Sequence, residues 1–277
     1  MSNQGVVDWH IHTRYSSCCK EDYGVAEVWD AAEQAGLAGA GLSDHSNYPS
    51  FNANFVRSQR EDIMNFGFQD NVRVGLEISI IDRKGKLGVN PKILGLLDFV
   101  MIAEHLHIAR PFSEFSNVKK KILKWVESGD NVKVQDLEQR TLELMCAGMQ
   151  VNNGVTILAH PWRFFLSRRI YDPLLLDLTP RLCEVAQDRG VAIEMPGTHL
   201  GILTDREQNL PFWDFVREFW RLVSRYDVRI SFGSDAHRLD KIGHFENLTS
   251  ALNEFGLSPR RLLTLADVPC KLAKIAK

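Results

Sequence analysis

Histidine and acidic residues recur along the chain in short motifs that could bind metal ions. The motifs are His10-Ile11-His12, Asp44-His45, Glu77, His105, His160, Glu194 and Asp235-Ala236-His237. Imidazole and carboxylate ligands together suit zinc, iron or manganese, whereas magnesium and calcium sites are built from oxygen ligands with little histidine. More ligands than one tetrahedral ion can accept imply more than one ion. The residue types therefore indicate a centre that holds several ions of Zn, Fe or Mn.

The spacing within two of these motifs favours chelation. Side chains alternate between the two faces of a β-strand, so residues i and i+2 share a face. His10 and His12 can therefore reach the same ion, and Asp235 and His237 are related in the same way. We expect these two pairs to lie on neighbouring strands.

The motifs fall at the ends of predicted β-strands. Short apolar or β-branched runs alternate with longer segments of helical period, which is typical of βα units around a parallel sheet. The seven runs are residues 6–12, 37–45, 72–79, 99–105, 155–160, 191–196 and 229–237. Each has its metal-capable side chain at or near its carboxyl end. Because the carboxyl ends of a closed parallel barrel meet on one face, we expect these side chains to surround one site.

Helical periodicity is found between and after the strands. The predicted helices are 25–35, 55–66, 118–148 with a break near Gly129, 174–189, 211–226, and two short helices within 246–277 around Ser258-Pro259. A chain of 277 residues is long for a common single domain but normal for an α/β barrel. We therefore expect one domain over residues 1–277.

Composition limits the classes of partner and compartment. The net charge of -2 and the pI near 6.5 provide no general positive field for a nucleic-acid backbone. The sequence shows no signal peptide and no apolar run of membrane-spanning length, which predicts a cytoplasmic protein that does not bind a membrane. The five cysteines are an odd, scattered set, so we expect reduced thiols. The oligomeric state stays open.

The order of the motifs resembles the PHP family, the polymerase and histidinol phosphatase superfamily. The matching stretches are residues 7–13, 42–45, 75–78, 98–105, 159–161, 193–195 and 232–237. They span most of the chain, and the segment 110–148 lies outside them. The resemblance implies a distorted (β/α)7 barrel and a metal-dependent phosphoesterase.

The resemblance also implies a centre of two to three divalent ions. The ligands would be His10, His12, Glu77 and Asp235 for a first ion; Glu77, His105 and His160 for a second; and His45 and His237 for a third. Members of the family with three ions often place a further His or acidic ligand where this chain has Cys18. A thiolate can bind zinc, so Cys18 is a candidate ligand, with Cys19 and Asp22 as alternatives.

Several polar residues near these motifs have other expected roles. Asp44 would orient the neighbouring histidine or a metal-bound water, and Glu194 would line the pocket or orient a ligand. His199 and His244 are predicted to lie on loops, where a solvated histidine is expected, with His199 facing the pocket as the alternative. His107 is expected to be a surface residue or one that supports the ligands. A phosphomonoester calls for arginine to bind its oxygens, and the candidates are first Arg163, then Arg14 and Arg238.

The predicted reaction needs no nucleophilic side chain. Clustered divalent ions supply hydroxide near neutral pH and neutralise the phosphate oxygens during attack. The sequence has no Gly-x-Ser-x-Gly, Gly-x4-Gly-Lys-Ser/Thr or Cys-x5-Arg motif. We therefore expect a phosphatase for a small-molecule phosphate monoester, and the resemblance to the family implies a substrate similar to histidinol phosphate. The alternatives are a phosphodiesterase or nucleotidase, an amidohydrolase, and a non-catalytic domain that metal ions stabilise.

Overall fold

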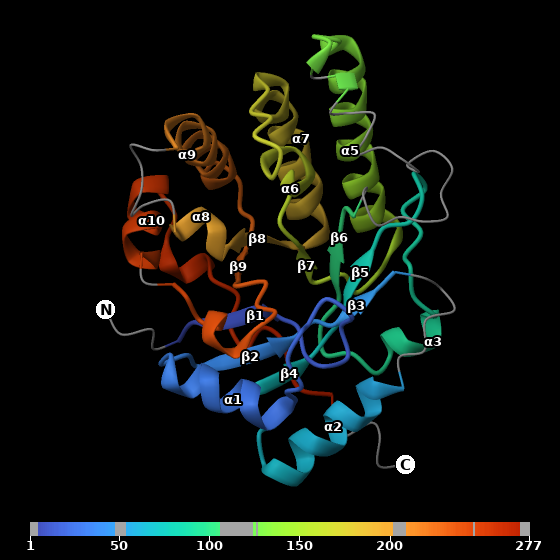
Figure 1. The fold of residues 1–277 in the computed structure, drawn as a ribbon, viewed down its shortest axis with the longest axis vertical. Helices are drawn as coiled ribbons and strands as arrows, with labels where there is room; N and C mark the ends of the chain where they lie inside the picture. The colour runs from blue at the N-terminus through green and yellow to red at the C-terminus, as the bar shows by residue number, and fades with distance from the viewer. Residues whose placement is uncertain are drawn as a thin grey trace.

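Parallel strand segments form one curved sheet in the computed structural model (Figure 1). The structure describes residues 5–47, 54–105, 124–125, 127–201, 209–245 and 247–271. Within these ranges the segments are β1 Val7–Ile11, β2 Gly39–Leu42, β3 His45–Ser46, β4 Val72–Val74, β5 Glu77–Ser79, β6 Met101–Ala103, β7 Ile157–Leu158, β8 Ala192–Pro196 and β9 Ile230–Gly233. Their order in the sheet is β3-β5-β6-β7-β8-β9-β1-β2-β4, and every pairing is parallel.

Two interrupted strands close this sheet into a barrel. β2 and β3 are parts of one strand, and β4 and β5 are parts of the next, because β2 pairs with β4 and β3 pairs with β5. Backbone hydrogen bonds continue at the interruption: Gly75 N donates to Leu42 O at 2.8 Å, and Met101 N donates to Leu76 O at 3.1 Å. The nine described segments therefore make seven barrel strands, at the seven predicted positions. The predicted distorted (β/α)7 barrel is confirmed.

Helices cover the outside of the barrel. They are α1 Val25–Gln34, α2 Phe55–Phe66, α3 Pro91–Leu94, α5 Asn131–Val151, α6 Arg163–Leu166, α7 Pro173–Arg189, α8 Gly197–Gly201, α9 Leu210–Ser224 and α10 Leu248–Phe255, with 3-10 turns at Leu239–Lys241 and Pro259–Arg261. α5, α7 and α9 lie side by side (Figure 1). In the described ranges, no helix combines the length and the apolar character that crossing a membrane requires.

Most predicted helices are found close to their expected limits. The prediction for α2 matches at both ends, and α9 buries the expected apolar face, which includes Trp213, Val216 and Phe219. The long helix begins at Asn131, where Asp130 caps it, and ends at Val151. Residues 118–123 of that prediction lie outside the described ranges.

The prediction of a second C-terminal helix, after Ser258-Pro259, is wrong. Ser258 accepts a hydrogen bond from Arg260 N, as a helix N-cap would, but only the 3-10 turn Pro259–Arg261 follows. Leu263 N then donates to Ile230 O at 2.7 Å, which pulls the chain alongside β9. Tertiary pairing therefore ends the helix that the local signal started.

A register shift in β1 directs its last residues into the site. Val7 and Trp9 belong to the apolar cluster inside the barrel, whereas Ile11, which would share their face in a regular strand, packs with the outer helices. The pairing of β1 with β2 shifts between Asp8 and Ile11. Such an irregularity changes the direction in which side chains point, so His10 and His12, on either side of Ile11, can both point into the barrel.

Candidate metal centre

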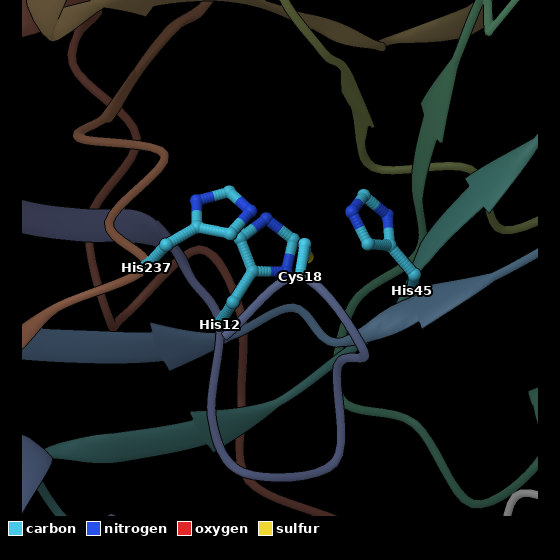
Figure 2. Close-up of side chains that lie close together, drawn as sticks. All are labelled: His12, Cys18, His45 and His237. Atoms are coloured by element: carbon cyan, nitrogen blue, oxygen red, sulfur yellow. The ribbon is translucent and has the colours of Figure 1, made fainter. Parts of the chain in front are cut away.

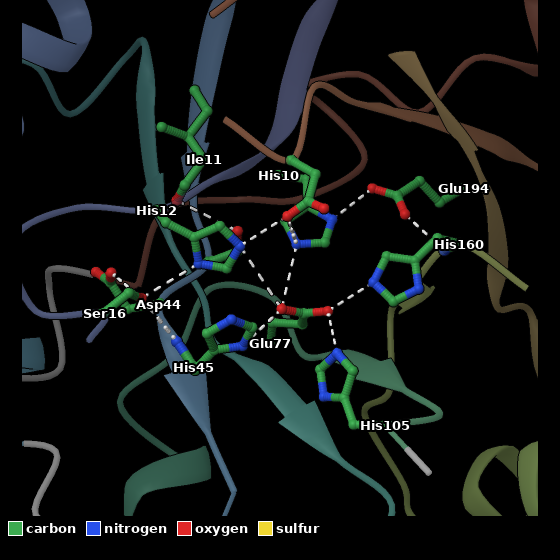
Figure 3. Close-up of polar contacts among 12 residues, drawn as sticks. His10, Ile11, His12, Ser16, Asp44, His45, Glu77, His105, His160 and Glu194 are labelled. Carbon is green, nitrogen blue, oxygen red and sulfur yellow. Dashed lines mark hydrogen bonds and ion pairs between the residues drawn. The ribbon is translucent and has the colours of Figure 1, made fainter. Parts of the chain in front are cut away.

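The carboxylate of Glu77, the first residue of β5, is surrounded by histidines (Figure 3). Its Oε1 lies 2.8 Å from His160 Nε2 and 3.0 Å from His105 Nε2, and its Oε2 lies 2.8 Å from His45 Nδ1, 3.3 Å from His10 Nε2 and 3.6 Å from His12 Nε2. Asp235 adds a second carboxylate, with Oδ1 3.0 Å from His12 Nε2 and 3.5 Å from His10 Nε2. The structure thus brings together residues that the sequence places on separate strands.

The hydrogen bonds on the outer side of His10 and His12 determine which ring nitrogen faces the carboxylates. Glu194 Oε1 lies 2.7 Å from His10 Nδ1, and an ionised carboxylate can only accept, so Nδ1 donates. Ser16 Oγ donates to Asp44 Oδ1 at 2.6 Å and must therefore accept from His12 Nδ1 at 3.2 Å. When these rings are neutral, Nε2 is therefore the unprotonated nitrogen.

Two further histidines are oriented in the same way. Ser79 Oγ donates to Asn47 Oδ1 at 2.5 Å and accepts from His105 Nδ1 at 2.8 Å. His237 Nδ1 donates to the backbone carbonyl of Asp235 at 2.8 Å. Each ring therefore presents the lone pair of Nε2, which is the arrangement that supporting hydrogen bonds produce around metal-binding histidines.

These lone pairs meet carboxylate oxygens, which is unfavourable unless a positive charge, either a proton on the ring or a metal ion, lies between them. Within the described residues, four buried atoms of this group have no hydrogen-bond partner: His10 Nε2, His45 Nδ1, Glu77 Oε2 and His160 Nδ1. The first three lie close together without forming a hydrogen bond, with Glu77 Oε2 2.8 Å from His45 Nδ1 and 3.3 Å from His10 Nε2. An unpartnered buried polar atom is costly and rare in folded proteins. The donor set and its orphaned atoms therefore fit metal ions.

The charges in the group also favour a cation. Burial disfavours a charged His10, but the carboxylates of Glu194, Glu77 and Asp235 prevail and raise its pKa well above the ordinary value. Burial likewise disfavours a charged Glu77, but the surrounding imidazoles prevail and hold its pKa well below the usual range. The buried acids of the group thus remain ionised and attract positive charge.

A second group of ligand atoms lies beside the first (Figure 2). It comprises His12, Cys18, His45 and His237, whose ligand atoms all lie within 4.8 Å of one another. Burial raises the pKa of the Cys18 thiol, but hydrogen bonds with His237 and His45 outweigh it and lower that pKa to about 7. Cys18 is thus ready to bind as a thiolate.

The two alternatives to Cys18 face other partners. The Cys19 thiol lies 3.5 Å from the carbonyl oxygen of His237 and 3.6 Å from that of Glu21. Asp22 is exposed and forms an ion pair with Arg14 at 3.0 Å. Among these three candidates, the geometry favours Cys18.

Backbone strain accompanies two of the proposed ligands. His160 and Asp235 have φ angles of +25° and +53°, in a region that residues other than glycine seldom adopt. The strand ends hold this segment in place, because His12 N donates to Ala236 O at 3.0 Å and Ala236 N donates to His10 O at 3.2 Å. Such strain is concentrated at functional sites, where the surrounding structure enforces it.

Comparisons with known proteins identify the fold. No protein-family profile matches the sequence, and no curated protein matches it. Histidinol phosphate phosphatase from Lactococcus lactis subsp. lactis, solved with Zn, L-histidinol and phosphate, matches with a TM-score of 0.57 and 11% identity over 92% of this chain and 95% of that one. A Listeria monocytogenes protein provisionally named histidinol phosphatase matches with a TM-score of 0.53 and 10% identity over 88% of this chain and 99% of that one. The chain has the histidinol phosphatase fold.

The carboxylate of Asp44 forms hydrogen bonds that support the candidate metal ligands. Its buried carboxylate accepts hydrogen bonds from Thr13 N at 2.8 Å, Thr13 Oγ1 at 2.7 Å, Ser16 Oγ at 2.6 Å and Gln59 Nε2 at 2.7 Å. Through Ser16 it orients the ring of His12. Ser16 Oγ also accepts from the backbone N of His45 at 3.1 Å, so Asp44 supports the adjacent His45, as the sequence suggested, and in addition the ring of His12.

Arg163 is the arginine candidate that the structure places beside the ligands. Its guanidinium forms an ion pair with the carboxylate of Asp235, and its side chain is 46% exposed. Arg14 pairs with Asp22, and Arg238 pairs with Asp240 at 2.8 Å, both on the surface. The position of Arg163 suits contact with an anion at the centre.

Of the two expectations for His199, the solvated loop is wrong and the position facing the pocket is found, because His199 lines the cavity beside His160 and Asp235. His199 lies in α8 and is only 4% exposed. Trp220 Nε1 donates to its Nδ1 at 3.2 Å, and burial lowers its pKa to about 4. The helix follows directly after β8, so the residues after Pro196 pack against α9 instead of extending into solvent. His244 is exposed as predicted, and His107 lies outside the described residues.

Proposed function

We propose that this chain is a PHP-type, metal-dependent phosphatase that hydrolyses a small phosphomonoester. The observation that carries the proposal is the set of five imidazole nitrogens that lie within 3.6 Å of the oxygens of the buried Glu77 carboxylate. The Lactococcus protein of the same fold was solved with Zn, L-histidinol and phosphate, which supports a phosphate ester as substrate.

The residues divide into ligand sets for two or three divalent ions of Zn, Fe or Mn. His10, His12, Glu77 and Asp235 would hold the first, Glu77, His105 and His160 the second, and His45, His237 and Cys18 the third. Bound divalent ions lower the pKa of water to near neutrality and neutralise phosphate oxygens.

The other side chains of the site would position these ligands and the substrate. Glu194, Ser16 and Ser79 keep three histidines in the tautomer that binds metal. Arg163 would leave Asp235 to donate to the nonbridging oxygens of the phosphate, for which a guanidinium is suited in shape and charge. Hydrolysis then needs no covalent intermediate with the protein.

A cavity beside the centre favours a small monoester over the alternatives. Its volume is about 330 Å³, and His160, Asp235 and Arg163 are part of its lining. This volume is at the lower end of the range for small-molecule sites, which suits a compact leaving group. A phosphodiesterase would need room for a second ester group, and a purely structural metal domain would need no cavity at the ions.

Metal analysis, followed by activity assays on a panel of phosphate monoesters and diesters, tests the proposal. We expect purified protein to retain two or three ions and to hydrolyse phosphomonoesters faster than bis-4-nitrophenyl phosphate with Zn, Mn or Fe. His10→Ala should abolish turnover and much of the bound metal, whereas the matched surface variant His244→Ala should change neither. Full metal content without hydrolysis of any monoester would overturn the phosphatase and favour the structural domain. Preference for the diester would favour the phosphodiesterase.

A further inference from the structure

The cavity of about 330 Å³ extends from the metal centre across the carboxyl ends of β7, β8 and β9. Its apolar wall includes Leu166 of α6, Pro196 of β8 and Phe212 of α9. A group attached to a phosphate at the centre would enter this space, because His160 and Asp235 belong both to the cavity lining and to the ligand group. The cavity is therefore placed to receive the leaving alcohol.

The tautomer of His199 determines whether its ring donates or accepts a hydrogen bond in the cavity. Trp220 Nε1 donates to His199 Nδ1 at 3.2 Å, and an indole nitrogen can only donate. His199 Nδ1 must therefore be unprotonated, which leaves the proton of the neutral ring on Nε2. Since His199 lines the cavity, Nε2–H is the polar group that it can present to a ligand, and it can only donate.

The charge of the lining disfavours a cationic ligand. Among the described lining residues, Asp235 is the only acid, and its carboxylate is engaged by His12 Nε2 and by Arg163. Arg163 itself lines the cavity and carries a positive charge. With an ester bound as proposed, Arg163 would bind the phosphate and Asp235 would bind a metal ion. An ammonium group in this space would then meet the hydrogen-bond donor of His199, and it would find no free carboxylate among the described lining residues.

We propose that the cavity selects phosphomonoesters whose alcohol carries a hydrogen-bond acceptor and no ammonium, with His199 as the specificity-determining residue. This inference rests on the proposed phosphatase function and narrows its substrate class. The apolar wall formed by Leu166, Pro196 and Phe212 would cover the uncharged body of the alcohol, and His199 Nε2–H would bind its acceptor. An amino alcohol phosphate such as histidinol phosphate is then a poorer substrate than its uncharged counterpart.

A matched pair of esters tests the charge preference. The pair is histidinol phosphate and 3-(imidazol-4-yl)propyl phosphate, which differ only in the amino group. We expect kcat/KM to be at least about tenfold higher for the ester without the amine, which corresponds to the loss of one favourable contact or the addition of one repulsion. Equal rates, or a preference for histidinol phosphate, would overturn the inference while leaving the phosphatase function intact.

Equilibrium binding tests the role of His199 without turnover. The probes are two non-hydrolysable phosphonates of similar length, one ending in imidazole and one ending in an alkyl group, measured by calorimetry on the metal-loaded protein. His199→Phe should weaken binding of the imidazole phosphonate about tenfold and leave the alkyl phosphonate unchanged. His199→Gln keeps a donor and should restore part of the loss, and His244→Gln should bind both probes as the unmodified protein does.

The outcomes separate the inference from the proposed function. Binding that depends on His199, without hydrolysis of any ester, would reject the phosphatase and keep the cavity as a ligand site. Hydrolysis with phosphonate affinities that His199→Phe leaves unchanged would reject the inference alone. If His199→Phe does not fold, the long-range 1H–15N spectrum of the unmodified protein shows which ring nitrogen of His199 carries the proton. A proton on Nδ1 would contradict the proposal that Nε2–H donates to the ligand.

Discussion

Glu194 Oε1 accepts a hydrogen bond from His10 Nδ1 at 2.7 Å across 184 residues of sequence (Figure 3). The other oxygen of the same carboxylate accepts from the backbone N–H of His160 at 2.6 Å. One buried acid thus orients two proposed metal ligands from different strands. The experiments below test what such supporting contacts contribute.

Replacing Glu194 should weaken metal binding without removing a proposed ligand. In Glu194→Gln, the amide can satisfy only one of its two donors, His10 or the backbone of His160, because its nitrogen must donate. We expect the affinity for the bound ions to fall about 10- to 100-fold, as measured by competition with a chelator. The exposed Glu184, which pairs with Arg181 at 3.0 Å, provides the control Glu184→Gln. Unchanged affinity in Glu194→Gln would show that its hydrogen bonds do not support the ligands.

Gly233 should tolerate no side chain, because it lies against the same acid. A Cβ atom at this position would lie 1.8 Å from Glu194 Oε1 and 2.6 Å from His10 Cβ. We expect Gly233→Ala to lose metal and to lower the free energy of unfolding by about 1–3 kcal/mol, as overpacking does. Gly95→Ala is the control, since a Cβ there meets nothing within 4 Å. Denaturant titration with metal analysis measures both effects, and a Gly233→Ala protein with normal metal content would contradict the packing argument.

Cys18 should react as a thiolate when the protein is free of metal. Its pKa of about 7 predicts alkylation by iodoacetamide with a midpoint near pH 7, whereas burial raises the pKa of Cys146 to about 11. Bound metal should protect Cys18, and Cys18→Ser should lose one ion. Mass spectrometry of alkylated peptides and metal analysis provide the measurements. Cys19→Ser is the control and should keep all of the bound ions. If Cys19→Ser loses an ion and Cys18→Ser does not, Cys19 is the ligand.

Arg163 should contribute to binding the phosphate group. We expect Arg163→Ala to raise KM for a phosphomonoester, and the inhibition constant of inorganic phosphate, by about tenfold or more, because a charged bidentate contact is lost. Arg163→Lys should restore only part of the loss, since lysine keeps the charge without the planar fork. Arg238→Ala, which removes a surface guanidinium, should have no effect. Phosphate inhibition that is unchanged in Arg163→Ala would exclude this role.

His199 should make the folded protein less stable as the pH falls. Its pKa is about 4 in the folded state, against an ordinary value of 6.5, so the unfolded chain takes up a proton that the folded chain does not. Stability that is fully present above pH 6.5 should therefore decline between pH 6.5 and 4, by up to about 3 kcal/mol from this residue. Urea titrations of metal-free protein across this range measure the decline. His199→Phe should show a shallower decline than the unmodified protein, and identical slopes would show that His199 is not buried in its neutral form.

The seven strands, the limits of α2 and the motifs that meet at the centre could be predicted from the sequence alone. The alternation of apolar and polar residues in a strand and their helical period in a helix are local properties of the sequence. They predict where each strand ends, and therefore which residues lie at its carboxyl end. His10, Glu77, His160 and Asp235 could therefore be assigned to one face of a barrel before any contact was known.

The contacts that support those residues could not be predicted, because they depend on how the folded chain packs. Ser79 orients His105 across 26 residues, Glu194 orients His10 across 184, and Trp220 buries His199. A single serine, glutamate or tryptophan has no periodic pattern that predicts its partner. The 3-10 turn after Ser258 has the same origin, because pairing with β9 overrides a local helix signal. Local spacing predicts the strand ends, whereas hydrogen bonds between distant segments form only when the closed barrel brings them together.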